Sequence, residues 1–290
     1  MHQDLIILAG GASSRMKKSN MSAPDEKLAA QANSRSKGLI SIDPDGRPLM
    51  DYLLYNAKRA GYTDVYIVIG GKEQLIQEFY GEKKKANNFH GLTINYAVQY
   101  IPEGREKPFG TADAVSQAVS QYPELNNRTY TVCNSDNLYS ESVLKALRMT
   151  QSPNAFIAYD RDALLFSTER IAQFALASLD KDGFLVDIIE KPDPQKSKLY
   201  KDDTGKIRVS MNIFKFSGPM FNTYVINCPV NKKRNEKELP TALLNMVQDH
   251  PSSVKGVPAS EHVPDLTSKD DIERMKNYID THYSGLKWDE

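Results

Sequence analysis

The sequence has few cysteines and no long apolar run, and each absence excludes a class of protein. Only Cys133 and Cys228 occur among its 290 residues, which is too few for a disulfide framework, and neither stands in a metal-binding spacing. A reducing setting is the default for such a chain. No apolar run approaches the roughly 20 residues that cross a bilayer, and residues 1–4 lack the features of a signal peptide. We expect a cytoplasmic protein with no membrane partner.

Net charge is also absent, since Lys plus Arg and Asp plus Glu both count 37. A neutral chain has no global field that favours nucleic acid, so we predict no nucleic-acid partner. Its 40% hydrophobic content is enough for a substantial core. No internal repeat or linker divides the sequence, so we predict one domain over residues 1–290. Whether it forms a homo-oligomer is left open.

The stretch from Asp4 to Met16, DLIILAGGASSRM, predicts a buried strand followed by a phosphate-binding loop. Leu5–Ala9 is a short apolar run that suits a strand buried on both faces. Gly10 and Gly11 permit close ligand approach and unusual backbone angles, and Arg15 adds a permanent charge. The spacing is neither G-x-G-x-x-G nor a P-loop. A glycine turn without a ligand is the alternative interpretation.

The polar residues 17–36 show little hydrophobic periodicity, and we predict a mobile loop that orders over substrate. Beyond it, apolar runs alternate with helical patterns, which favours a parallel-rich α/β sheet with helices on both faces. The predicted strands are 5–9, 64–69, 92–98, 130–133, 155–159, 175–178, 184–189, 209–216 and 253–257. The predicted helices are about 48–60, 73–80, 111–121, 239–247 and 269–283.

Thr111 and Asp136 lie at the ends of predicted elements, where ligands are commonly bound. Thr111 is expected to cap the helix that begins at Gly110 and Thr111, so that free N–H groups point toward a ligand. Asp136 follows the strand 130–133 at its carboxyl end, where open α/β sheets place ligands. A turn or helix cap is the alternative role for this aspartate.

The ordered series LAGGASSRM, SKGLISI, KPFGTADAV, NSDN, IIEKP and SMNIFKF resembles the nucleotidyltransferase family that includes the sugar-1-phosphate nucleotidylyltransferases. The resemblance implies a three-layer α/β/α Rossmann-like fold with a predominantly parallel mixed central sheet. It also implies transfer of a nucleoside monophosphate from a nucleoside triphosphate to a sugar 1-phosphate, with Mg²⁺ as cofactor. The nucleotide would bind the half formed by about 1–135 and the sugar phosphate the half formed by about 136–290.

The same resemblance assigns roles to individual residues. The implied catalytic residues are Arg15, Lys37, Asp136 and Lys191. The implied nucleotide-binding residues are Ala9, Gly10, Gly11, Gln99, Gly110 and Thr111, with Gln99 near the base. The implied sugar-phosphate-binding residues are Glu190, Lys191 and Asn212, and the implied metal ligands are Asp136 and Asp265.

The sequence also departs from the family pattern. Ser13 and Ser14 replace Gly-Thr before the arginine, and Thr241 stands where a second metal aspartate is common. Asp265 is our substitute ligand, with a surface turn as the alternative. Asn212 replaces a glycine. The alternative interpretation of Lys37 is that it is a surface lysine next to a glycine.

Two other functions are retained as alternatives. Ser-Ser-Arg-Met and Lys37 with its neighbours also resemble molybdenum-cofactor guanylyltransferases, which act on a pterin phosphate. A catalytically inactive nucleotide-sugar sensor is the second alternative. The sequence does not specify the base or the sugar.

Overall fold

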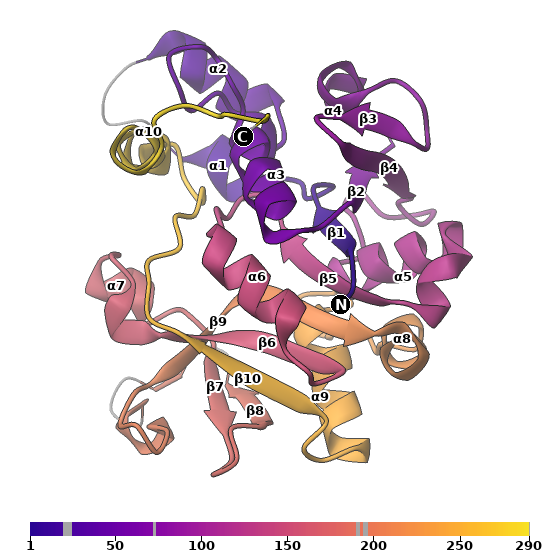
Figure 1. Cartoon of the computed structure of the whole chain (residues 1–290), viewed down its shortest axis with the longest axis vertical. Coiled ribbons are helices and arrows are strands. Elements are labelled where there is room, and N and C mark those ends of the chain that lie inside the picture. Colours follow the sequence, from indigo (N-terminus) through magenta and orange to yellow (C-terminus); the bar gives the residue numbers. More distant parts are fainter. Residues whose placement is uncertain (20–24, 72–73, 190–191, 194–196, 290) are drawn as a thin grey trace.

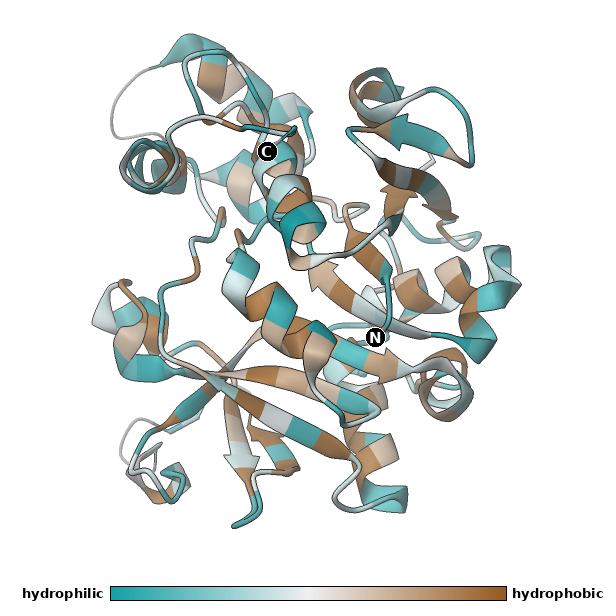
Figure 2. Ribbon diagram, viewed as in Figure 1, coloured by the Kyte–Doolittle hydropathy of each residue, from teal (hydrophilic) through white to brown (hydrophobic). Residues whose placement is uncertain are grey.

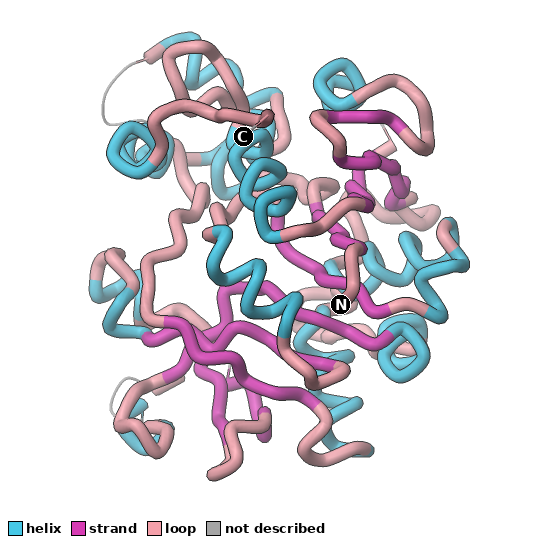
Figure 3. The backbone as a smooth tube through the Cα atoms, in the orientation of Figure 1, coloured by secondary structure: helices cyan, strands magenta, loops and turns pink. Residues whose placement is uncertain are grey.

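A computed structural model describes residues 1–19, 25–71, 74–189, 192–193 and 197–289. A ten-stranded sheet runs through both halves of the chain, with the strand order β10-β6-β9-β5-β1-β2-β4-β3 and a β7–β8 pair joined at β9. The pairs β1–β2, β1–β5, β2–β4 and β6–β10 are parallel. Figure 3 shows the strands as one continuous band through the molecule.

The strand bounds follow the predicted apolar runs closely. The strands are β1 Asp4–Leu8, β2 Asp64–Gly70, β3 Asn87–Phe89, β4 Leu92–Gln99, β5 Thr129–Asn134, β6 Asn154–Asp160, β7 Leu176–Leu179, β8 Leu185–Ile189, β9 Arg208–Ser217 and β10 Val254–Ala259. Every predicted strand is present. The short β3 was not predicted, and it pairs antiparallel with β4.

Helices cover both faces of the sheet (Figure 1). The α-helices are α1 Ser14–Lys18, α2 Glu26–Ser34, α3 Leu49–Ala60, α4 Gln74–Tyr80, α5 Thr111–Gln121, α6 Glu141–Met149, α7 Thr168–Ile171, α8 Gly218–Ile226, α9 Leu239–Asp249 and α10 Asp270–His282. Short 3₁₀ turns are η1 Lys37–Leu39, η2 Pro123–Asn127, η3 Arg161–Ala163 and η4 Ser197–Tyr200. Among the described residues, none of these helices is long and apolar enough to cross a bilayer.

The alternation of side chains along β1 divides the core into two. Leu5 and Ile7 point to one face, where they join the buried residues of α3, α6 and α10. Ile6 points to the other face and packs with the buried residues of α5, α8 and α9. Because β1 is covered on both faces, its sequence is a continuous apolar run rather than an alternating one. Figure 2 shows apolar residues along the central strands and polar residues on the outer helices.

The prediction of a loop over residues 17–36 was wrong for the part that the structure describes. Residues 14–18 and 26–34 are the helices α1 and α2. The Asp25 carboxylate accepts a hydrogen bond from the Leu28 backbone N–H at 2.9 Å, which caps α2. Leu28, Gln31 and Ala32 form the buried stripe of this helix. Three positions are too few to stand out in a polar sequence, which is why the periodicity was missed.

Candidate active site

Two cavities share a wall at the carboxyl end of β5, and the first of them also borders the carboxyl ends of β1 and β4. The first, of about 360 Å³, lies between the loop at 9–15 and the start of α5. The second, of about 840 Å³, lies between Asp136 and the segment around Asn212. Arg15, Thr111 and Asp136 line both cavities. Two ligands bound in these cavities would therefore meet at Asp136.

The loop at residues 9–15 differs from the prediction that Gly10 and Gly11 supply its unusual backbone angles. The left-handed backbone angle falls at Ser13, with φ 52°, while Gly10 and Gly11 are outside the positive-φ region. A Cβ on Gly10 would lie 3.3 Å from the Gly70 nitrogen, so this glycine permits close strand packing. A Cβ on Gly11 would meet nothing within 4 Å and would project into open space beside the cavity. Gly11 is thus the glycine whose missing side chain leaves room for a ligand.

Gly110 is required by a loop from the second half of the chain. Its φ is 103°, and a Cβ there would collide with the Lys237 backbone. The backbone at Lys237 accepts from the Ala112 N–H at 3.0 Å and donates to Phe109 at 2.7 Å. The prediction that Thr111 caps the helix α5 is therefore wrong. Gly110 occupies the cap position, one first-turn N–H is already bonded, and the Thr111 hydroxyl accepts from the Leu239 N–H at 2.9 Å.

The Gln99 side chain is held in one orientation at the wall of the first cavity. Its amide nitrogen donates to the Gly110 carbonyl at 3.0 Å and to the Asp113 carboxylate at 2.8 Å. The same Asp113 oxygen accepts from the Gln117 amide at 2.8 Å. Both N–H bonds of the Gln99 amide are thereby used, so its oxygen is the group available to a ligand.

Lys37 and Asp136 meet across 99 residues of sequence. Lys37 Nζ lies 2.8 Å from Asp136 Oδ2, and their side chains are 11% and 23% exposed. Lys37 is therefore not a free surface lysine. Gly38 brings this 3₁₀ turn against β5, since a Cβ on Gly38 would lie 3.0 Å from the Ser135 carbonyl oxygen. The residue pair Lys-Gly thus places the ammonium group at the end of β5.

Asp265, the residue suggested from the sequence as a substitute metal ligand, lies beside Asp136. Asn137 and Asp265 form an isolated β-bridge, and the Leu266 N–H donates to the Asp136 carbonyl at 2.9 Å. Burial raises the pKa of Asp265, the negative charge of Asp136 raises it further, and the positive charge of Arg170 opposes both. Two neighbouring carboxylates repel each other, which favours a cation between them.

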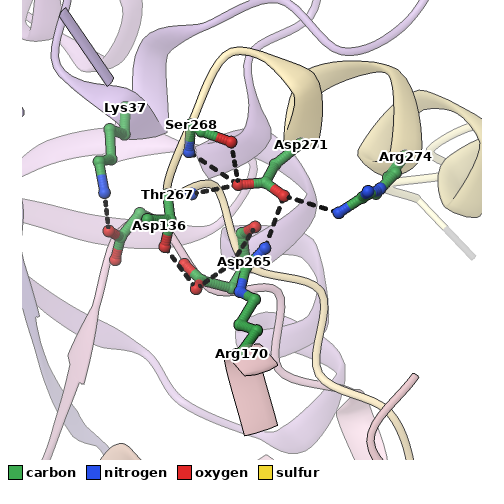
Figure 4. A network of polar contacts seen from close by, with 8 residues as sticks. All are labelled: Lys37, Asp136, Arg170, Asp265, Thr267, Ser268, Asp271 and Arg274. Atoms are coloured by element: carbon green, nitrogen blue, oxygen red, sulfur yellow. Dashed lines mark hydrogen bonds and ion pairs between the residues drawn. The ribbon is translucent and has the colours of Figure 1, made fainter. Parts of the chain in front are cut away.

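Arg170 on α7 and Asp271 on α10 support Asp265 (Figure 4). The Arg170 guanidinium lies 2.6 Å from Asp265 Oδ2 and 2.6 Å from Asp271 Oδ1. Asp271 Oδ2 in turn accepts from the backbone N–H groups of Thr267 at 2.9 Å and Ser268 at 2.7 Å. The network fixes the loop that carries Asp265. Sequence patterns do not reveal the part played by Arg170, because it lies 95 residues from Asp265 and 101 from Asp271.

Asn212 lies at the wall of the second cavity with φ 57°. Asparagine is among the few residues that adopt this left-handed angle readily, which explains why it can replace the family's glycine. Its side chain is exposed. Glu190 and Lys191 lie outside the described residues, so their predicted roles are not located.

The sequence reasoning also missed two charged residues that line the first cavity, Lys107 and Glu236. Lys107 stands inside the KPFG segment and could have been found there, because it precedes the Gly110 turn by only three positions. Glu236 belongs to the distant loop that closes over that turn. Together with Arg15 and Lys37, Lys107 brings the number of cationic side chains at this cavity to three.

These features define the class of the protein. The profile of the nucleotidyl transferase family matches residues 5–261, and the chain belongs to that family. The structure is similar over 98% of both chains to a protein assigned as a glucose-1-phosphate thymidylyltransferase from Bacillus anthracis with bound sucrose, with a TM-score of 0.67 and 17% identity. It is also similar to a UDP-glucose pyrophosphorylase in complex with UDP-glucose, over 97% of this chain and 99% of the other, with a TM-score of 0.68 and 15% identity. At these identities the likeness shows the fold, which confirms the predicted α/β architecture with a mostly parallel central sheet.

Three curated relatives are similar in sequence. The low-salt glycan biosynthesis nucleotidyltransferase Agl11 of Haloferax volcanii is 24% identical over 84% of this chain and 57% of its own length. A chloroplastic/amyloplastic glucose-1-phosphate adenylyltransferase small subunit of Triticum aestivum is 25% identical over 69% and 40%. Glucose-1-phosphate adenylyltransferase 1 of Vibrio vulnificus is 27% identical over 66% and 44%. The chain thus spans about half the length of the curated relatives that it matches.

Proposed function

We propose that this protein transfers a nucleoside monophosphate from a nucleoside triphosphate to a sugar 1-phosphate, forming a nucleoside diphosphate sugar and pyrophosphate. The observation that carries the proposal is the pair of cavities that meet at Arg15 and Asp136. The nucleotide would occupy the cavity built mainly by residues 1–135 and the sugar phosphate the one built mainly by residues 136–290. Relatives and structural neighbours named for glucose 1-phosphate or UDP-glucose support this choice of acceptor.

The reaction needs two anions to be brought together. An oxygen of the sugar 1-phosphate attacks the α-phosphorus, the bond from that phosphorus to the bridging oxygen breaks, and pyrophosphate leaves with the electron pair. Catalysis of such a step is mainly positioning and charge neutralisation. Arg15 and Lys107 line the nucleotide cavity and would bind the leaving phosphates. Lys37, held at Asp136, would donate to the phosphoryl group that is transferred.

Asp136 and Asp265 fit a magnesium ion. Both supply carboxylate oxygens, and Mg²⁺ is usually held by one or two carboxylates together with substrate phosphates. No group of three potential ligands of the His, Cys, Asp or Glu type occurs in the described part of the chain, so substrate and water would complete the coordination. When bound, the ion would neutralise phosphate charge and polarise the α-phosphorus.

On the acceptor side, we assign the sugar to the wall formed by Asn212, whose amide can donate to or accept from a hydroxyl. Glu190 and Lys191 stay predicted partners of the sugar hydroxyls and of the attacking phosphate. On the donor side, the Gln99 oxygen would accept from an N–H of the base, with Ala9, Gly10, Gly11 and Thr111 around the nucleoside. A cytoplasmic location is part of the proposal, because both cysteines are free thiols.

Pyrophosphate release from a matrix of nucleoside triphosphates and sugar 1-phosphates with Mg²⁺ tests the proposal. We expect release with at least one sugar 1-phosphate and its loss in Asp136→Ala. Turnover only with GTP and a pterin phosphate would replace the proposal with the molybdenum-cofactor alternative. Tight binding without turnover across the matrix would replace it with the sensor.

A further inference from the structure

A third cavity, of about 670 Å³, is lined mainly by polar residues and lies at the amino-terminal ends of central strands, away from the candidate active site. We call it the amino-edge cavity, because the strands β1, β2 and β5 begin at it with Asp4, Asp64 and Thr129. The carboxyl ends of β1 and β5 border the candidate active site. A ligand here would therefore not touch the reacting groups.

Two cations face this cavity without a carboxylate partner among the described residues. Lys215 on β9 is only 6% exposed, and its ammonium group donates to the Thr150 carbonyl at 2.6 Å. An ammonium group has three N–H bonds, so two remain for a ligand. Burial lowers the pKa of Lys215, because it disfavours the charged form.

Arg148 on α6 supplies the second cation. Its Nε donates to the His2 carbonyl at 2.8 Å, and Nη1 lies beside the Met1 sulfur at 3.9 Å, a weak acceptor. The guanidinium rests on Gly61, where a Cβ would lie 3.0 Å from Nη1. Its orientation is thereby fixed while most of its donors stay available. A planar guanidinium with free donors matches the oxygens of a phosphoryl group.

His2 lies close enough to both cations for their charges to act on its ring. Its Nε2 lies 2.8 Å from the Thr131 hydroxyl, while Nδ1 is buried without a partner among the described residues. Burial lowers the pKa of His2 to about 3, and the charges of Lys215 and Arg148 add to that effect. A buried polar atom without a partner is uncommon in proteins. The cavity is therefore lined by two cations without a carboxylate partner among the described residues, next to a histidine that stays neutral.

The rest of the wall is polar and partly acidic. Asp4 is already paired with Arg128 at 3.0 Å, whereas Asp64 and Gln151 also line the cavity and can bond hydroxyl groups. We propose that the amino-edge cavity is a binding site for a small phosphorylated hydroxy compound, with the phosphoryl group between Lys215 and Arg148 and the hydroxyls toward Asp64 and Gln151. The two cations select a dianion, and the acidic rim disfavours a larger polyanion such as nucleic acid.

The ring resonances of the five histidines allow a local test by NMR, with His2→Gln used only to assign the His2 signal. Inorganic phosphate should shift the His2 resonance saturably at low ionic strength, and glycerol 3-phosphate should do so at lower concentration. Lys215→Met and Arg148→Met should each weaken both ligands by at least about tenfold, roughly one charge-assisted hydrogen bond. Lys145→Met removes an exposed charge from the same helix and should leave the affinities unchanged.

Several results would overturn the proposal. These are the absence of a saturable His2 shift, an affinity that neither methionine variant lowers relative to the parent, or loss of the shift in Arg15→Met, which would assign the phosphate to the candidate active site. Equal affinity for phosphate and glycerol 3-phosphate would overturn the hydroxy-compound assignment. If Lys215→Met does not fold, as judged by the remaining histidine signals, Arg148→Met carries the test, because that side chain is only partly buried.

Discussion

Replacing Arg170 by methionine removes a cation that touches Asp265 and Asp271, both at 2.6 Å. The Arg170 side chain is 19% exposed and those of the aspartates are 13% and 3% exposed, so water cannot replace the lost contacts fully. Removing one partner of a buried ion pair costs about 3 to 5 kcal/mol. Asp271 keeps its bonds to the Thr267 and Ser268 backbone, so we expect the lower end, about 3 kcal/mol.

Urea unfolding of Arg170→Met measures this cost, and Arg274→Met is the matched control. Arg274 also contacts Asp271, at 3.4 Å, but its side chain is 69% exposed, so its loss should cost less than about 0.5 kcal/mol. Loss of Arg170 should also raise the pKa of Asp265, because Arg170 holds it down. Since a metal ligand must be ionised, the acid limb of the pH–activity profile should move to higher pH. Equal stability of the two variants, with an unmoved acid limb, would refute this reasoning.

The other predictions concern single positions. Gly110→Ala should destabilise the fold by about 2 kcal/mol or more, because the φ of residue 110 is 103° and the added Cβ would collide with the Lys237 backbone. Gly11→Ala should leave the melting temperature unchanged and weaken nucleotide binding in a titration. Asp113→Ala removes the carboxylate that accepts from the Gln99 amide, and should lower the kcat/KM preference among nucleoside triphosphates by about tenfold. Burial raises the pKa of Asp51 to about 6 from 3.8. Between these two pH values the folded state keeps a proton on Asp51 that the unfolded state has lost. The free energy of unfolding therefore falls as the pH rises from the lower value to the higher one. Asp51→Asn should therefore be more stable than the parent above pH 6, by up to about 3 kcal/mol in urea unfolding, and an unchanged pH dependence would contradict this.

The parts of the fold that could be predicted are those in which a local pattern decides the structure. The apolar runs of β1, β2 and β5 are buried on both faces, so hydrophobicity alone indicates them. The helices α6 and α8 were missed, although the Ser140 hydroxyl that accepts from the Val143 N–H at 3.2 Å is a recognisable cap. The loop assigned to residues 17–36 failed because α2 buries only three residues.

The candidate site could be predicted where a residue lies in a motif at a strand end, as Asp136 does. Asp265 was found through its resemblance to a late family aspartate, and the bridge to Asn137 places it beside Asp136. Arg170 and Lys107 were missed for different reasons. Arg170 gains its role from partners about a hundred residues away, whereas Lys107 was overlooked inside a quoted motif. The position of the left-handed angle, at Ser13 rather than at a glycine, could not be read from composition.

Phosphorus NMR of the reaction mixture tests the central claim most directly, because it follows the α-phosphate itself. With Mg²⁺, a nucleoside triphosphate and the acceptor found in the matrix, the account predicts a sugar-linked diphosphate and pyrophosphate in equal amounts. Asp136→Asn should slow their formation by about a thousandfold, the equivalent of about 4 kcal/mol of transition-state stabilisation. Release of phosphate or pyrophosphate without a sugar-linked product, or an unchanged rate in Asp136→Asn, would contradict the account.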